Sequence, residues 1–205
     1  MSQYFRVHPD NPQARLVRQA VEIIRDGGVV VYPTDTAYAI GCHINDKAAL
    51  ERIVRIRRLD EKHLFTLLCR DLSEIATYAR VDNVTYRLLK AHTPGKYTFV
   101  LPATGEVPRR LQDGKRKTIG IRVPENAICQ ALLAELGEPL ITATMQLPGE
   151  DPLTDPEDIR DRLGHQVDLV IDGGFGELSE TSVIAIEEGR TEVLREGAGP
   201  VGDFR

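Results

Sequence analysis

Apolar residues recur along the chain with two spacings, one typical of helices and the other of strands. Helical spacing predicts a helix through residues 16–24, with Asn11 as its N-cap, Pro12 at its first position and Gly27-Gly28 at its end. The run Val29–Tyr32 that follows is apolar and β-branched, which indicates a buried strand. A helix followed at once by a strand is typical of α/β proteins.

The same two patterns continue to the end of the chain. They predict further helices at residues 47–56, 72–78, 84–91, 126–136 and 156–163. They predict further strands at residues 64–69, 97–101, 118–123, 140–143, 167–171, 181–186 and 192–195. Helices that alternate with strands indicate an α/β fold, and no repeat or linker-like stretch divides residues 1–205. We therefore predict a single domain, with the basic loop 104–117 as its most mobile segment.

Composition narrows the setting of the protein. With 205 residues and 41% hydrophobic content, the chain is long enough to bury a full core. No run approaches the ~18 apolar residues of a membrane span, and residues 1–9 lack the apolar core of a signal peptide. Cys42, Cys69 and Cys129 are odd in number and widely spaced, which favours reduced, buried thiols over disulfides or a zinc site. We expect a cytoplasmic protein with no membrane partner and no bound structural metal.

Charge is unevenly distributed, although the net charge of −5 argues against a general polyanion-binding protein. Basic residues cluster between Arg109 and Arg122, and again between Arg52 and Arg58. Local basic clusters on an acidic chain favour an anionic ligand bound at one place, such as nucleotide phosphates or an RNA backbone. A solvated basic surface is the alternative that this pattern leaves open.

The most informative polar residues come directly after the strand Val29–Tyr32. Thr34, Asp35 and Thr36 supply two hydroxyls and a carboxylate where the chain leaves the sheet. Strand ends often carry the chemistry of α/β proteins, because rigid pairing holds polar groups at the rim of a cleft. A simple turn stabilised by Asp35 fits the pattern equally well. The common phosphate-loop, dinucleotide-binding, metalloprotease and hydrolase motifs are absent.

Several segments, in order, resemble one protein family. Residues 32–41 are similar to its YPTDTxYGLG motif, residues 93–102 to its PGPxTxxLP segment and residues 118–124 to its TVGVRxP strand. Nearer the C-terminus, its DGG, STV and LRxGA pieces resemble residues 172–174, 181–183 and 194–198. Together these segments cover nearly the whole chain. It resembles the YrdC/YciO family of threonylcarbamoyl-AMP synthases and their relatives, and is most similar to the YciO branch.

The resemblance implies a twisted open α/β sheet with flanking helices and a large basic cavity. Synthases of this family combine L-threonine, bicarbonate and ATP with Mg²⁺ into threonylcarbamoyl-AMP, the donor for a modified adenosine in tRNA. The amine of threonine forms a carbamate, whose oxygen attacks the α-phosphate and expels pyrophosphate. Because this step gathers negative charge, cations and hydroxyl donors must be held in place around the phosphates.

The resemblance also implies roles for single residues. Arg122 would pair with a carboxylate or phosphate, Ser182 would donate to the carboxylate of the substrate, and Arg195 would reach the nucleotide. From the residues alone, Arg122 is better interpreted as a surface arginine and Ser182 as a strand end. The remaining substrate or nucleotide contacts would come from Thr34, Asp35, Thr36, Tyr38 and Thr98.

The chain departs from the synthase pattern at two motifs. At the KxR motif it has Arg57 and Leu59, so one cation is kept in altered form and one is lost. At the SxN motif it has Thr144 and Gln146, so a hydroxyl is kept and an amide is lengthened by one methylene. If the missing guanidinium stabilised the transition state, its loss would cost roughly 3 kcal/mol, about a hundredfold in rate.

Two neighbours of the altered KxR motif bear on this loss. Arg58 is the candidate substitute for the missing cation, although adjacent residues point in different directions. His63 titrates near neutral pH, so it could act as a general base or bind phosphate when charged. An exposed histidine before a strand is the alternative.

Two functions are compatible with the sequence. The first is an enzyme that binds ATP or AMP, L-threonine and bicarbonate, with weak or altered synthase activity carried by Arg57, His63, Thr144 and Gln146. The second is a module that binds double-stranded RNA or tRNA through its phosphates. The chain has no Trp and few other aromatic residues, which favours duplex over single-strand recognition. We favour the enzyme, because a hydroxyl-rich strand end suits a small ligand better than an RNA surface.

Overall fold

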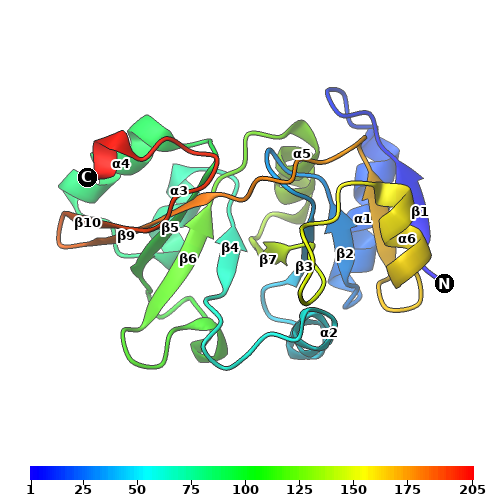
Figure 1. The fold of residues 1–205 in the computed structure, drawn as a ribbon, viewed down its shortest axis with the longest axis horizontal. Coiled ribbons are helices and arrows are strands. Elements are labelled where there is room, and N and C mark those ends of the chain that lie inside the picture. Colours follow the sequence, from blue (N-terminus) through cyan, green and yellow to red (C-terminus); the bar gives the residue numbers. More distant parts are fainter.

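Ten strands form one mixed sheet in the computed structural model, which describes all residues from 1 to 205 (Figure 1). Their order across the sheet is β1-β8-β2-β3-β7-β4-β6-β5-β9-β10. In chain order the strands are β1 (Gln3–Arg6), β2 (Val30–Tyr32), β3 (Ala39–His43), β4 (Thr66–Leu68), β5 (Tyr97–Pro102), β6 (Thr118–Arg122), β7 (Leu140–Thr144), β8 (Leu169–Asp172), β9 (Ser182–Glu187) and β10 (Arg190–Arg195).

Six α-helices connect these strands: α1 (Ala14–Arg25), α2 (Lys47–Arg57), α3 (Leu72–Tyr78), α4 (Asn83–His92), α5 (Ala127–Leu136) and α6 (Pro156–Leu163). Short 3₁₀ helices form at η1 (Arg109–Leu111) and η2 (Gly202–Phe204). None of the helices has the length and apolar character needed to cross a membrane. Five of the six α-helices begin at a side chain that accepts a hydrogen bond from their first turn: Asp46, Asp71, Asp82, Asn126 and Asp155.

Four of the helices, α2, α3, α4 and α6, cover one face of the sheet. Their apolar side chains form the larger core with residues from strands β2 to β9. Burial of each such side chain contributes roughly 1.5–3 kcal/mol, so this core supplies most of the stability of the fold. Fully buried members from both layers include Ile53, Ile75, Leu89, Ile40 and Ile121.

Helices α1 and α5 cover only part of the opposite face. Their side chains form a smaller core with Val30, Tyr32, Leu140 and Leu68, and this core ends at β4. Beyond it, the strand register brings Thr66, Gly120, Val100 and Ala185 side by side on β4, β6, β5 and β9. We call the region under α1 and α5 the covered half of this face, and the region from β4 to β9 its open half.

A segment that links distant parts of the sheet completes the fold. Residues 173–181 leave β8 and cross the sheet to β9, as the orange ribbon in Figure 1 shows. We call this stretch the crossing segment. The backbone N–H of Gly176 donates to Thr154 O, and the backbone N–H of Ala37 donates to Ser179 O. The second bond holds the segment beside the turn that follows β2.

The predicted helices and strands are confirmed, apart from two strands that the sequence pattern missed and one wrong helix start. The missed strands are β1 and β3. The first helix begins after Gln13 and not at Asn11, because the Gln13 side chain bonds His8 N while Asn11 N bonds the His8 ring. The three cysteines are free and buried, as expected. The basic loop 104–117 contains η1 and buries Leu111.

Candidate functional site

A cavity of about 480 Å³ occupies the part of the open half that lies next to the covered half. Its floor is formed by Thr66 of β4 and Thr142 of β7, around the side-chain-free Gly120 of β6. A Cβ atom at Gly120 would lie 2.7 Å from Thr66 Oγ1 and 3.1 Å from Phe65 O, so the floor leaves no room for one. Eight of the predicted site residues line this cavity: Tyr38, Arg57, His63, Thr98, Arg122, Thr144, Gln146 and Arg195.

Arg122 is the most deeply buried cation of the site, with 7% of its surface exposed. Its Nη2 atom forms an ion pair with the buried Asp35 carboxylate and donates to Thr36 Oγ1 at 3.0 Å. Thr34 Oγ1 lies 3.4 Å from the same nitrogen. The turn after β2 is therefore built around Arg122, and its three polar residues hold the arginine without lining the cavity themselves. The Nε atom of Arg122 is buried and has no hydrogen-bond partner.

Arg57 reaches the cavity from the last turn of α2. Its Nη1 atom donates to the carbonyl oxygen of Thr144 at 2.6 Å, while its buried Nε atom has no partner. Burial lowers the pKa of Arg57, and the negative charge of Glu180 opposes this shift. Unsatisfied buried N–H groups are rare, because leaving one unpaired costs about 1–3 kcal/mol. Arg57 and Arg122 thus each present an unused donor beside the same cavity.

The residues next to Arg57 do not replace the missing cation. Arg58 adopts a left-handed backbone conformation with φ of 49°, which ends α2 and leaves its side chain exposed and outside the cavity lining. Leu59 packs against the larger core. The prediction that Arg58 substitutes for the lost guanidinium therefore finds no support in the placement of its side chain.

A hydroxyl network holds Arg195 at the other end of the cavity. Arg195 Nε donates to Thr181 O at 3.0 Å, and its Nη2 donates to Thr181 Oγ1 at 3.2 Å. Thr98 Oγ1 lies 2.7 Å from Thr181 Oγ1. The neighbouring Ser182 does not line the cavity, because its hydroxyl donates to Gly199 O and accepts from Gly197 N. The sequence predicted that Ser182 would present a hydroxyl to the ligand, but at the cavity it is Thr181 that presents one.

His63 lies on the cavity wall near Arg57. Burial and the positive charge of Arg57 both lower the pKa of His63 from its usual value of 6.5. The imidazole is therefore neutral at pH 7 and available as a proton acceptor or hydrogen-bonding group. His63 also lines a second cavity of about 530 Å³ on the open half, bordered by the basic residues Lys62, Arg110, Lys115 and Arg116.

Tyr38 fixes the crossing segment against the cavity wall. Its hydroxyl donates to Gly174 O at 2.6 Å and accepts from Gly173 N at 3.1 Å, and burial raises its pKa. A Cβ atom at Gly176 would lie 2.6 Å from the Tyr38 ring, so the segment packs closely there. Tyr38 therefore lines the cavity and also fixes the position of the crossing segment beside it.

The site residues that sequence reasoning missed are Thr66, Thr142, Glu180 and Thr181. Thr66 and Thr142 are threonines with apolar neighbours in their strands, and Thr142 accepts a hydrogen bond from Tyr32. A hydroxyl at an inward position of a buried strand was the signal that could have pointed to them. Glu180 carried no such signal, because the crossing segment has no periodic pattern.

The charges of the cavity favour an anionic ligand. Arg57, Arg122 and Arg195 line it, against the single carboxylate of Glu180 in the lining and that of Asp35 behind Arg122. No group of three or more His, Cys, Asp or Glu side chains is arranged to hold a metal ion. Mg²⁺ is commonly bound through one or two carboxylates together with substrate phosphates, so Glu180 and a bound polyphosphate would fit that mode.

The fold and the site define an α/β protein with an arginine-lined cavity on one face of its sheet. Residues 22–197 match the model of the Sua5/YciO/YrdC family, which carries the description "Telomere recombination". The chain belongs to this family. It is 58% identical to the uncharacterized protein YciO of Escherichia coli K12 over the full length of both chains. The crystal structure of E. coli YciO superimposes with a TM-score of 0.97 over 100% of both chains.

More distant relatives include enzymes. The threonylcarbamoyl-AMP synthase of Vibrio vulnificus is 30% identical over 185 residues, which cover 88% of this chain and 98% of the synthase. The P. abyssi Sua5 structure complexed with L-threonine superimposes with a TM-score of 0.90 at 24% identity, over 98% of this chain and 59% of Sua5. The last likeness shows a shared fold, and Sua5 has a large further part that this chain does not match.

Proposed function

We propose that the cavity binds ATP and L-threonine together and supports adenylation of a threonine-derived carbamate, in a weakened or altered form of the synthase reaction. The observation that carries this proposal is the convergence of three arginines, Arg57, Arg122 and Arg195, on one cavity. Guanidinium groups bind phosphates and carboxylates through charge-assisted hydrogen bonds. The relationship to threonylcarbamoyl-AMP synthases and to a threonine-bound Sua5 supports the choice of ligands.

The three arginines contribute differently to the proposed reaction. Arg122 is neutralised by Asp35, so it offers directed N–H donors with little net charge. Arg57 has no carboxylate within ion-pair distance and supplies the uncompensated positive charge that phosphates require. As pyrophosphate leaves the α-phosphorus, the charge that accumulates on the bridging oxygen would be stabilised by Arg57 and Arg195.

The altered KxR motif supports a weakened reaction. With Leu59 in the core and Arg58 exposed, the chain offers one guanidinium where the synthases carry two cations. His63 lies close enough to Arg57 for their charges to interact, and it would become a second cation only when protonated. The ATP phosphates would hold Mg²⁺, which would offset part of their charge, and Glu180 is the one carboxylate of the cavity lining that could join them as a ligand.

Calorimetric titration with MgATP, with and without L-threonine and bicarbonate, tests the proposal when the same mixtures are assayed for pyrophosphate. We expect saturable ATP binding that Arg57→Gln weakens about tenfold or more, since it removes a charge-assisted donor. Arg55→Gln is the matched control, because Arg55 is exposed on the same helix and lines no part of the cavity. Equal ATP binding by both variants, or no binding by the parent protein, would contradict the proposal.

The second cavity favours one further candidate function, the binding of duplex RNA or tRNA through phosphates. Its lining includes the apolar Phe65, Val100 and Ile186, and its four basic side chains outnumber three carboxylates, those of Glu61, Asp113 and Glu187. An RNA-binding surface of this kind loses affinity steeply as salt rises. Filter binding of a short RNA duplex to the parent and to the double variant Lys115→Gln/Arg116→Gln measures this slope. If the substitutions leave the dependence of RNA affinity on salt concentration unchanged, the second cavity is not the RNA-binding surface.

A further inference from the structure

Glu180 is an unexpected residue in a cavity built for anions. It is the only acidic side chain in the cavity lining, and it lies close enough to Arg57 and Arg195 to interact with both charges. A carboxylate at this position repels the phosphates that the arginines attract. Its presence therefore points to a cationic partner, which is either a metal ion brought in with the phosphates or a cationic group of the ligand itself.

Holding Arg195 in place is not a sufficient reason. Arg195 is already anchored by its two hydrogen bonds to Thr181, whereas Glu180 Oε2 lies 3.5 Å from Arg195 Nη1. No hydrogen bond from the protein reaches either carboxylate oxygen of Glu180. The backbone is nevertheless fixed, because Glu180 O accepts from Ala198 N at 2.8 Å. The backbone of Glu180 is thus fixed, while its partly exposed carboxylate, paired only with Arg195, can accept hydrogen bonds from a ligand.

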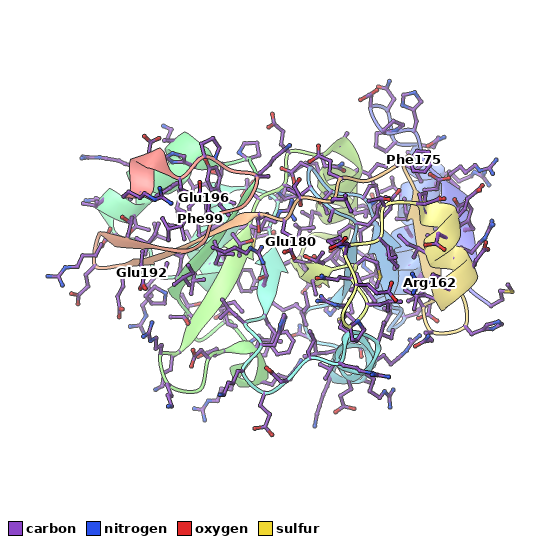
Figure 2. The ribbon with its side chains drawn as sticks, in the orientation of Figure 1. Phe99, Arg162, Phe175, Glu180, Glu192 and Glu196 are labelled. Carbon is purple, nitrogen blue, oxygen red and sulfur yellow. The ribbon has the colours of Figure 1, made fainter.

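The location of Glu180 suits direct contact with a ligand. It is the second-to-last residue of the crossing segment, separated from β9 by Thr181, and 31% of its side chain is exposed. Figure 2 shows it near the middle of the molecule, far from Phe175 at the other end of the segment and apart from Glu192 and Glu196 toward β10. Among these labelled carboxylates, only Glu180 belongs to the cavity.

We infer that Glu180 binds the ammonium group of the amino-acid ligand and makes the cavity selective for α-amino acids over the corresponding acids without an amine. This inference rests on the proposed function, since it concerns the same ligand. A zwitterion carries one positive and one negative group, and the cavity offers a carboxylate and arginines within one enclosure. A charge-assisted hydrogen bond from the ammonium would satisfy the unused oxygens of Glu180.

The test compares L-threonine with 3-hydroxybutanoate, which is threonine without its amino group, in calorimetric titrations of the parent protein and Glu180→Gln. We expect the parent to bind threonine about tenfold or more tightly than 3-hydroxybutanoate, and Glu180→Gln to lose most of that difference. Glu180→Asp keeps the charge on a shorter side chain and should restore part of it. Glu177→Gln is the matched control on the same segment, because Glu177 pairs with Lys96 outside the cavity.

The possible failures separate the two ideas. A parent protein that binds ATP but not threonine would overturn both the inference and the threonine part of the proposed function. Unchanged preference for threonine in Glu180→Gln would overturn the inference alone. The inference would also fail if Glu180→Gln weakened only the Mg²⁺-dependent binding of ATP, because the carboxylate would then be a metal ligand. Thermal unfolding of each variant shows whether a loss of binding reflects a loss of folding.

Discussion

The covered half and the open half belong to one face of one sheet, yet they are built from different residues. Under α1 and α5, the strands present Val30, Tyr32, Leu68 and Leu140, which are fully buried or nearly so. From β4 to β9, the same face presents Thr66, Gly120, Val100 and Ala185, none larger than valine, and two cavities lie over it. Large apolar side chains attract a covering helix, whereas small and hydroxylated ones leave room for a ligand.

The boundary between the halves lies on the paired strands β4 and β6. Leu68 of β4 pairs in register with Arg122 of β6, so the last apolar residue of the covered half adjoins the most buried cation of the site. One strand position thus separates a packed core from a binding cavity. The cavity therefore arises because the side chains on this part of a continuous sheet are small, and not because the sheet is interrupted.

Removing the cation at this boundary should have the largest effect. Arg122→Ala leaves the Asp35 carboxylate buried without its partner, which should cost about 3–5 kcal/mol of unfolding free energy. The turn after β2 should loosen as well, and ATP binding should be lost. Urea denaturation of the parent, Arg122→Ala, Asp35→Asn and the double variant measures the coupling of the pair. Additive losses in this cycle would mean that the ion pair contributes nothing of its own.

Filling the open half should have a moderate effect on stability and a larger one on binding. Gly120→Ala places a methyl group against Thr66 and Phe65 O, so we expect a loss of about 1–3 kcal/mol and weaker ATP binding from the raised floor. Leu132→Ala in α5 is the contrasting control. It should cost about 2–5 kcal/mol in the covered half and leave the ATP affinity of the folded protein unchanged. The comparison would break if Gly120→Ala bound ATP normally.

The smallest expected effect is on pH dependence, through His63 in the open half. Because its pKa in the folded state is lowered, the unfolded chain takes up this proton first as the pH falls. The stability linked to His63 is therefore complete above its usual pKa of 6.5 and declines below it. His63→Gln should lose less stability than the parent between about pH 7 and pH 5, as followed by urea denaturation. His165→Gln, at an exposed position, should behave like the parent.

Sequence periodicity predicted most helices and strands because each is a local pattern with local caps. It missed β1, whose residues Gln3–Arg6 are partly exposed at the sheet edge and show no continuous apolar run. It also missed β3, because Ala39–His43 directly follows a polar turn that was interpreted as a candidate site and not as the start of a strand.

The candidate site was predicted in part, and the errors have one cause. Adjacent residues of a strand face opposite sides, so the choice between Thr181 and Ser182 depends on the pairing of Thr98 with Val183, two residues far apart in the chain. The choice between Arg58 and Leu59 depends in the same way on how α2 ends. The pairing of Arg122 with Asp35 joins residues 87 positions apart, and no local pattern reports it.

The crossing segment also determines when the site can form. A growing chain completes the strands and helices of the covered half once β8 has been made, since β1, β2, β3, β7, α1 and α5 all precede it. Strand β5 still lacks its outer neighbour at that stage, and Glu180, Thr181 and Arg195 have not yet been synthesised. The residues that close the cavity therefore belong to the last part of the chain to be made. A chain that has not yet reached Arg195 therefore lacks part of the cavity lining and cannot hold a ligand there as the complete fold would.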